Sequence, residues 1–249
     1  MSFQQLALIA AVGFAGSFYG VVSGGGGLLV IPGLIFVGMP APAAVAASRL
    51  GILGLSVAGA TRFRQAGLVH PAAGWRLLIV TAAGSFAGSL LLLRVDADLF
   101  QRGFGVVTIL VAPLIIFGRR LRLERPGEAP SPRRRRFGYA LAFPIGVYAG
   151  LFGASWATFF TYLMVAAFGR SFLEGAAMRA FVGIAVGAVT ALTVGLGGIL
   201  QWTPALTLFG AMMAGSYLGA SFSLARGERY ARHLVAVIAI IAGVKLILP

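Results

Sequence analysis

Two arginines lie inside long apolar segments, where a charged side chain is energetically costly. Arg49 lies eight residues after the start of one segment near Ala41, and Arg179 lies eight residues after the start of another at Ser171. At 1.5 Å per residue, each would be about 12 Å deep, close to the middle of a hydrocarbon layer about 30 Å thick. An arginine at that depth should face a cavity or a partner and not lipid. Its forked guanidinium suits the binding of an oxyanion.

Four consecutive glycines interrupt what would otherwise be one apolar helix near the start of the chain. Gly24, Gly25, Gly26 and Gly27 follow Ser23 directly. Because glycine reaches backbone angles that a helix forbids, the run predicts a break in the helix. Unwound backbone at membrane depth is tolerated only where protein buries it or where it lines a wet cavity. The helix that restarts after the run would direct its free amides and positive dipole end at the break, which favours an anion there.

A second break is predicted at 152–156, where Gly153 lies inside the sequence Phe-Gly-Ala-Ser-Trp and Ser155 is placed to cap the following helix. Both breaks and both arginines are expected near the membrane midplane, so their hydrogen-bond donors should converge on one place. Ser48, next to Arg49, adds a hydroxyl. The predicted solute site therefore comprises Ser23, Gly24, Gly25, Gly26, Gly27, Ser48, Arg49, Gly153, Ser155 and Arg179.

The composition is that of a protein embedded in a membrane. Hydrophobic residues make up 59% of the 249 residues and charged residues only 10%, far from the balance of a soluble domain. Cysteine is absent, histidine occurs twice and carboxylate side chains occur six times. Disulfides are therefore excluded, and the chain has few residues that could form a metal cluster or a histidine-based catalytic triad. We expect no enzyme activity, no bound metal and no cofactor.

Long apolar segments recur along the whole chain. A membrane-spanning helix needs about 20 apolar residues, so eight segments qualify or nearly do, and two shorter ones are interpreted as half-helices. The predicted spans are 3–22, 41–61, 73–93, 99–117, 137–152, 171–194, 203–225 and 231–248, and the half-helices are 28–39 and 157–169. Alternating strand patterns are absent, which argues against a barrel. The first segment has no basic residue before it and no convincing cleavage site, so we expect it to be retained.

The net charge of +14 is carried mostly by loops between the apolar segments. Arginines concentrate in a linker at 119–136, which the positive-inside rule places in the cytoplasm. This distribution favours an orientation signal with some attraction to anionic lipid, and RNA or regulatory binding is the weaker alternative. We expect no nucleic-acid partner. The linker divides the chain into a first transmembrane repeat at 1–118 and a second at 137–249.

A shift of 130 positions superimposes the two halves, bringing Arg49 onto Arg179 and Gly20 onto Gly150. Because charges are rare in this chain, their register predicts an internal duplication. A parallel arrangement of the repeats would place the basic loop at 226–232 outside, against the positive-inside rule. An inverted arrangement places that loop and the linker in the cytoplasm and the uncharged loop at 195–203 outside. We therefore predict inverted repeats, an architecture that many secondary transporters share.

Several residues also have a purely structural interpretation. Arg179 could pair with Glu174 on one helix instead of facing a solute. Trp156, beside the second break, could line a cavity, whereas Trp75 and Trp202 are typical of anchors at the membrane interface. Close helix packing is the better interpretation of two further patterns, Gly84-x-x-x-Gly88 and Gly215-x-x-x-Gly219.

The glycine-rich segment at 20–34, with Pro32 after the glycine run, is followed by Ala-Ala-Ser-Arg ending at Arg49 and by Gly67-Leu-Val. Together with the pattern at 84–88, these motifs resemble the sulfite exporter TauE/SafE family of bacterial membrane permeases. The resemblance covers nearly the whole chain. In the second half, Gly153-Ala-Ser-Trp replaces a glycine-rich run, and Arg49 stands where the family pattern usually has a small or hydroxylated residue. The resemblance implies transport of sulfite, sulfonates or related sulfur-containing anions, often outward.

The sequence thus predicts an all-α membrane protein of eight spanning helices and two half-helices in the inner membrane, with the linker cytoplasmic. Its predicted function is that of a secondary transporter that exports one small anionic solute through a midplane site between rocking repeats. An anion channel and a non-transporting membrane scaffold are the alternatives. The expected partners are the solute and the lipid bilayer, and a homo-oligomer is compatible with the sequence.

Overall fold

The computed structural model describes residues 1–24, 26–95, 130–153 and 156–226. These residues form eight helices and contain no strand, which confirms the expectation of an all-α protein. The helices are α1 (Phe3–Ser23), α2 (Gly27–Phe36), α3 (Ala41–Gln65), α4 (Pro71–Leu92), α6 (Pro132–Leu151), α7 (Trp156–Phe168), α8 (Phe172–Leu196) and α9 (Trp202–Arg226). Five of them are long and apolar enough to cross a membrane: α1, α3, α4, α8 and α9. The predicted spans at 99–117 and 231–248 lie outside the described residues.

The break at the glycine run is confirmed. Helix α1 ends at Ser23, and Gly24 follows in the left-handed region with φ of 81°, donating its N–H to the carbonyl of Gly20. Glycine is the residue that adopts this conformation without a steric cost, so it ends the helix here. Helix α2 restarts at Gly27 and ends at Phe36. This half-helix is therefore shorter than the predicted segment at 28–39.

A break of the same kind separates α6 from α7. Helix α6 ends at Leu151, and Gly153 has φ of 72°. Helix α7 begins at Trp156 and ends at Phe168, too short to span a membrane. Ala154 and Ser155 lie outside the described residues. The chain therefore contains the same order of elements twice: a long helix, a short helix and two long helices.

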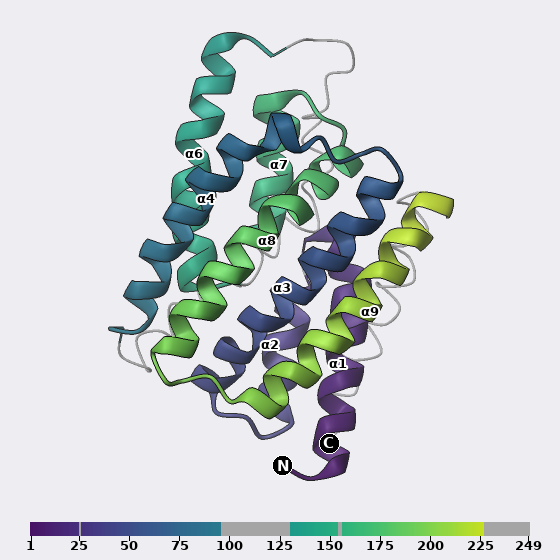
Figure 1. Cartoon of the computed structure of the whole chain (residues 1–249), viewed down its shortest axis with the longest axis vertical. Coiled ribbons are helices and arrows are strands. Elements are labelled where there is room, and N and C mark those ends of the chain that lie inside the picture. Colours follow the sequence, from purple (N-terminus) through teal and green to yellow (C-terminus); the bar gives the residue numbers. More distant parts are fainter. Residues whose placement is uncertain (25, 96–129, 154–155, 227–249) are drawn as a thin grey trace, which may run out of the picture.

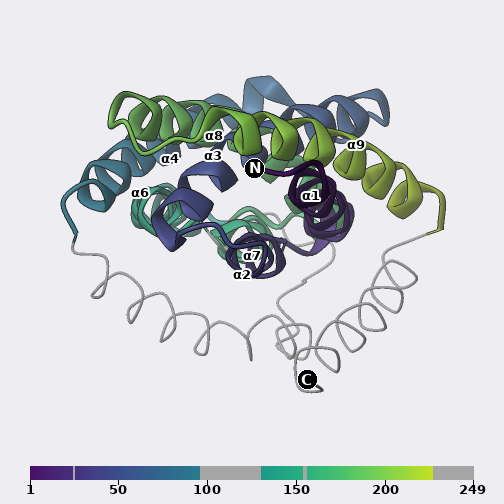
Figure 2. The ribbon, with the colours of Figure 1, turned by 90° about the horizontal axis from the view of Figure 1, so that it is seen from below.

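The two halves exchange their outer helices. Helix α4 packs most extensively against α6, and α9 packs against α1. In both pairs glycines bring the backbones together, because a Cβ added at Gly88 would meet the backbone of Val147, and one at Gly219 would meet that of Phe18. This confirms the packing role predicted for Gly84-x-x-x-Gly88 and Gly215-x-x-x-Gly219. Figure 2 shows α2 and α7 lying between α1 and α6, with α3, α4, α8 and α9 covering them on one side.

Helix directions follow from which residues meet. Gly59 of α3 lies against Ala180 of α8, and Gly187 further along α8 lies against Leu53, earlier in α3, so α3 and α8 are antiparallel. Helices α4 and α6 instead run in the same direction, as α1 and α9 do. Figure 1 shows the result: α1, α3 and α9 rise in the view, while α4, α6 and α8 descend.

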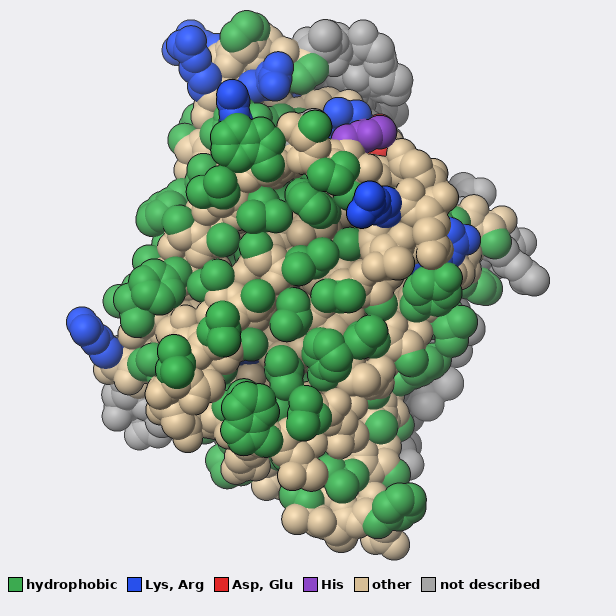
Figure 3. Space-filling view, viewed as in Figure 1, with side chains coloured by type: hydrophobic (Ala, Val, Ile, Leu, Met, Phe, Trp, Pro, Cys, Tyr) green, Lys and Arg blue, Asp and Glu red, His purple; other side chains and the backbone are tan. Residues whose placement is uncertain are grey.

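Most described cations lie at one end of the molecule, the upper end in Figures 1 and 3. They are carried by the end of α3, the start of α4 and α6 and the turn before α8, and Arg94 lies beyond α4 at the opposite end. The prediction that the arginines at 133–136 occupy a loop is wrong. Ser131 accepts a hydrogen bond from the N–H of Arg134 and Pro132 occupies the first turn, so α6 begins at Pro132 and includes these arginines.

Candidate functional site

A cavity of about 40 Å³ lies beside the glycine break, between the two halves. Helices α1, α2 and α3 contribute to its lining from the first half, and the second break with α8 and α9 from the second half. The polar and backbone lining includes Gly24, Gly26, Gly27, Ser48, Ser56, Gly153 and Arg179, with the indole of Trp156 beside them. The first residue of α2 is thus at the cavity wall, where the free amides of a helix N-terminus carry partial positive charge.

Close backbone approach explains why glycine forms this wall. A Cβ at Gly20 would lie 2.7 Å from the Cα of Gly26, so α1 and α2 touch through their backbones. A Cβ at Gly24 would lie 2.6 Å from the backbone nitrogen of Thr158, so the first break also touches α7. Real Cβ atoms do not approach that closely. The first break is therefore in direct contact with the first turn of α7, next to the second break, and residues of both breaks line the cavity.

Arg179 of α8 reaches from the second half to the end of α1. Its side chain is 2% exposed, and Nη1 donates a hydrogen bond of 3.1 Å to the carbonyl of Gly20 while Nη2 donates to that of Val21. These carbonyls belong to the last turn of α1, and that of Gly20 also accepts from the N–H of Gly24. Arg179 also lines the cavity. It therefore caps one helix and places a cation at the cavity wall.

Arg49 of α3 makes the corresponding contact with the end of α6. Its side chain is 1% exposed, and its two terminal nitrogens donate to three carbonyls at 2.8–3.0 Å, those of Ala149, Gly150 and Leu151. The Nε atom has no acceptor among the described residues. A Cβ at Gly153 would overlap this guanidinium, so glycine at the second break is what admits the arginine. Arg49 is not in the cavity lining.

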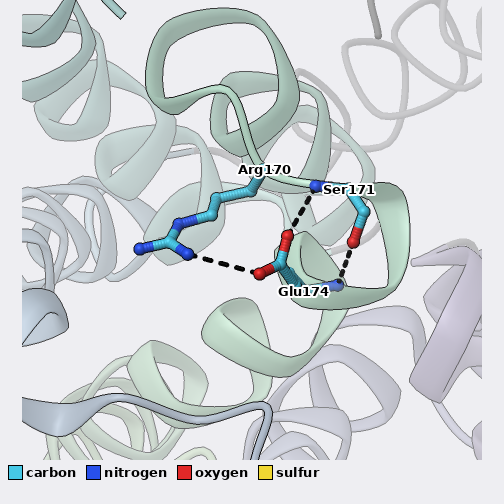
Figure 4. A network of polar contacts seen from close by, with 3 residues as sticks. All are labelled: Arg170, Ser171 and Glu174. Carbon is cyan, nitrogen blue, oxygen red and sulfur yellow. Dashed lines mark hydrogen bonds and ion pairs between the residues drawn. The ribbon is translucent and has the colours of Figure 1, made fainter. Parts of the chain in front are cut away.

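Glu174 does not neutralise Arg179. It accepts from the N–H of Ser171 at 2.8 Å, while the Ser171 hydroxyl accepts from the N–H of Glu174, an arrangement that caps α8. Its other carboxylate oxygen pairs with Arg170 at 3.3 Å (Figure 4). The interpretation that Arg179 pairs with Glu174 is therefore wrong. Every other carboxylate side chain of the sequence lies outside the described residues.

Of the ten residues predicted for the site, six line the cavity: Gly24, Gly26, Gly27, Ser48, Gly153 and Arg179. Ser23 and Arg49 do not, and Gly25 and Ser155 lie outside the described residues. The hydroxyl of Ser23 donates to the carbonyl of Tyr19, and that of Ser48 donates to the carbonyl of Val45. Both hydroxyls thus bond within their own helices, as hydroxyls in membrane helices often do.

Sequence reasoning missed Ser56 and left Trp156 open between two roles. Ser56 lies two turns after Ser48, with Ile52 between them, and all three line the cavity. The spacing of four residues between Ser48, Ile52 and Ser56 places them on one face of a helix, and this spacing could have identified Ser56. Trp156 is 4% exposed and lines the cavity, whereas Trp75 and Trp202 are 51% and 62% exposed. Burial thus separates the cavity tryptophan from the two surface ones.

The chain matches the model of the sulfite exporter TauE/SafE family over residues 8–246. A probable membrane transporter protein of Haemophilus influenzae is 25% identical, over 97% of this chain and 94% of that protein. The probable membrane transporter protein YfcA of Escherichia coli strain K12 is 24% identical, over 97% and 89% of the two chains. The probable membrane transporter protein ORF9 of a Sinorhizobium species is 24% identical, over 99% and 94%.

No solved structure gives a significant match to the chain. The family match covers nearly all of the sequence, and the similar proteins are named as membrane transporters. Both agree with the five apolar helices of spanning length in the described part of the chain. The family resemblance noted from the sequence is thereby confirmed: this multi-pass membrane transporter belongs to the sulfite exporter TauE/SafE family.

Proposed function

We propose that this protein is a secondary transporter that exports a small sulfur-containing oxyanion of the sulfite or organosulfonate class. The observation that carries the proposal is the cavity at the junction of the two breaks, with the start of α2 and Arg179 in its wall. Free helix amides and a guanidinium both favour a negatively charged solute. The family name supports sulfite as the first anion to test.

The size of the cavity supports a small solute. A cavity needs a volume of roughly 10–15 Å³ to hold one water molecule, so a cavity of 40 Å³ has room for about three waters. This suits an anion of a few heavy atoms better than a sugar or a peptide. Larger organosulfonates would require the cavity to widen. We therefore place sulfite ahead of organosulfonates within the proposed class.

We further propose that the transporter consists of inverted repeats with eight spanning helices and two half-helices. The antiparallel crossing of α3 and α8 supports this arrangement, as does the exchange of α4 and α9 between the halves. The cavity would then lie near the membrane midplane, and rocking of the halves about it would expose it alternately to each side. The end of the molecule that carries most cations would lie on the cytoplasmic side of the bacterial inner membrane.

The proposal is tested with purified protein in liposomes loaded with sulfite. Saturable efflux that follows an imposed ion or pH gradient supports a carrier. Flux that rises linearly with concentration and shows single-channel currents would identify an anion channel instead. Absence of flux and of binding across sulfite, thiosulfate and taurine would leave the scaffold as the remaining function and overturn the proposal. The variant Arg94→Gln serves as a matched control, because this arginine is exposed and does not line the cavity.

A further inference from the structure

The helix ends around the cavity present a problem for an anion site. At each break a long helix ends where a short helix begins, so α1 ends beside the start of α2, and α6 ends beside the start of α7. A helix C-terminus carries about half a negative charge and an N-terminus about half a positive charge. The two ends at one break would therefore nearly cancel. Broken helices alone do not make this cavity attractive to an anion.

The two arginines change that balance. Arg179 donates to the last turn of α1, and Arg49 donates to the last three carbonyls of α6. Each guanidinium adds a full positive charge to a helix end that carries about half a negative charge. In the described part of the chain no carboxylate offsets either arginine, because Glu174 pairs with Arg170. Each break, together with its arginine, is thus left net positive.

We infer that Arg49 and Arg179 determine the charge selectivity of the cavity by neutralising the C-terminal ends of α6 and α1. In this role they are positioning residues, and neither needs to contact the solute. The inference rests on the proposed function only in taking the cavity as a solute site. It explains why Arg49, which is not in the lining, is nevertheless 1% exposed with its terminal nitrogens on three carbonyls.

The native chain offers a probe of the potential inside the cavity. Trp156 lines the cavity and is buried, whereas Trp75 and Trp202 are exposed and can be replaced by phenylalanine. Fluorescence of the remaining Trp156 is then quenched with iodide, with caesium and with neutral acrylamide at equal ionic strength. Acrylamide reports access, and the ratio of the iodide to the caesium quenching constant reports the sign of the local potential. This readout does not require the physiological solute.

We expect iodide to quench Trp156 about tenfold more effectively than caesium in the parent protein, because a cleft lined by one sign of charge concentrates counter-ions by at least about that factor. Arg49→Gln and Arg179→Gln should each lower the ratio several-fold, with acrylamide quenching unchanged. Arg49→Lys and Arg179→Lys should keep the ratio near that of the parent, since lysine retains the charge but cannot reproduce the forked hydrogen bonds. Arg94→Gln should have no effect.

The pairing of glutamine and lysine variants separates the charge from the hydrogen bonds. Glutamine and lysine both keep a donor for the helix end, but only lysine keeps the positive charge, so only a role of the charge predicts a lowered ratio in the glutamine variants and a retained ratio in the lysine variants. The inference is overturned if both glutamine variants keep the iodide-to-caesium quenching ratio of the parent protein. It is also overturned if folded lysine variants lose the preference for iodide. Where a glutamine variant does not yield monodisperse protein, the lysine variant at the same position decides by this second criterion.

The quenching experiment also separates this inference from the proposed substrate. Iodide preference that depends on the arginines, in a protein that neither binds nor moves sulfite, supports the inference and removes the sulfur oxyanion. Sulfite transport by a protein whose quenching ratio does not depend on the arginines supports the proposed substrate and overturns the inference. A parent protein in which even acrylamide fails to reach Trp156 contradicts the premise that solutes enter the cavity, and it overturns both.

Discussion

Arg179 donates a hydrogen bond of 3.1 Å to the carbonyl of Gly20, a residue 159 positions earlier in the chain. Arg49 and Gly150 form the corresponding contact at 3.0 Å in the opposite direction, from the first half to the second. A shift of 130 positions relates both the two donors and the two acceptors. Each half thus supplies the cap that completes the broken helix of the other, so the site depends on both halves being docked.

The first prediction concerns the stability that these caps provide. Arg49→Met removes every donor from the last turn of α6 and leaves three carbonyls without their partner. A buried polar group that loses its hydrogen bond costs about 1–3 kcal/mol, so we expect a loss of about 3 kcal/mol in the free energy of unfolding. Denaturant titration of the purified protein in detergent measures it. Arg94→Met, at an exposed position, should change stability by about 0.5 kcal/mol or less. Equal stabilities of the two variants would contradict the capping role.

The second prediction compares two glycines with similar backbone angles. Gly24 has φ of 81° and Gly67 has φ of 75°, but only at Gly24 would a Cβ meet neighbouring atoms, those of α7. Both alanine variants carry the left-handed strain of about 1–2 kcal/mol. Gly24→Ala must in addition push α7 away from the first break. We expect it to abolish sulfite transport in liposomes, while Gly67→Ala loses some thermal stability and keeps its transport rate. If the two variants transport alike, the contact between the breaks is unimportant for function.

Much of this arrangement was predictable because glycine and arginine leave clear marks in an apolar sequence. The run at 24–27 predicts the break, and the register of Arg49 with Arg179 predicts that the two side chains have equivalent roles. Their hydrogen-bond partners were not predictable in the same way. A backbone carbonyl is present at every residue, so nothing in the sequence marks the last turns of α6 and α1 as the acceptors. The sequence therefore predicts a solute contact for both arginines, or an ion pair with Glu174 for Arg179, and not the capping of another helix.

The prediction of a loop at the start of α6 was wrong for a different reason. The run of arginines at 133–136 suggested a solvated loop, but Ser131 and Pro132 form a strong signal for a helix start. The prediction gave the arginine run more weight than the helix-start signal, although an arginine run and a helix start can occur together. A helix can extend beyond its apolar segment and carry arginines in its first turns, as α6 does.

The third prediction tests the contact between α4 and α6. A Cβ at Gly88 would overlap the backbone of Val147 and lie 2.9 Å from the nitrogen of Leu151, whereas a Cβ at Gly210 of α9 would meet nothing within 4 Å. Gly88→Ala should therefore separate α4 from α6 and lower the melting temperature in detergent by several degrees, in line with a cost of about 1–3 kcal/mol for overpacking. Gly210→Ala should be neutral or stabilising, because alanine favours helix over glycine. Size-exclusion chromatography with thermal unfolding checks both variants, and a melting temperature for Gly88→Ala equal to that of Gly210→Ala would refute the close contact.

The last prediction concerns orientation in the membrane. Cysteine is absent from the chain, so a single introduced cysteine reports its own side without a background. Arg64 lies in the last turn of α3, at the cation-rich end, and Gln201 precedes α9 at the opposite end. Both positions are exposed. Because the positive-inside rule keeps arginine-rich ends in the cytoplasm, an impermeant maleimide added to intact cells should label Gln201→Cys and spare Arg64→Cys. Inside-out vesicles should show the reverse. Labelling of Arg64→Cys on intact cells would contradict the proposed orientation and place the cation-rich end outside the cytoplasm.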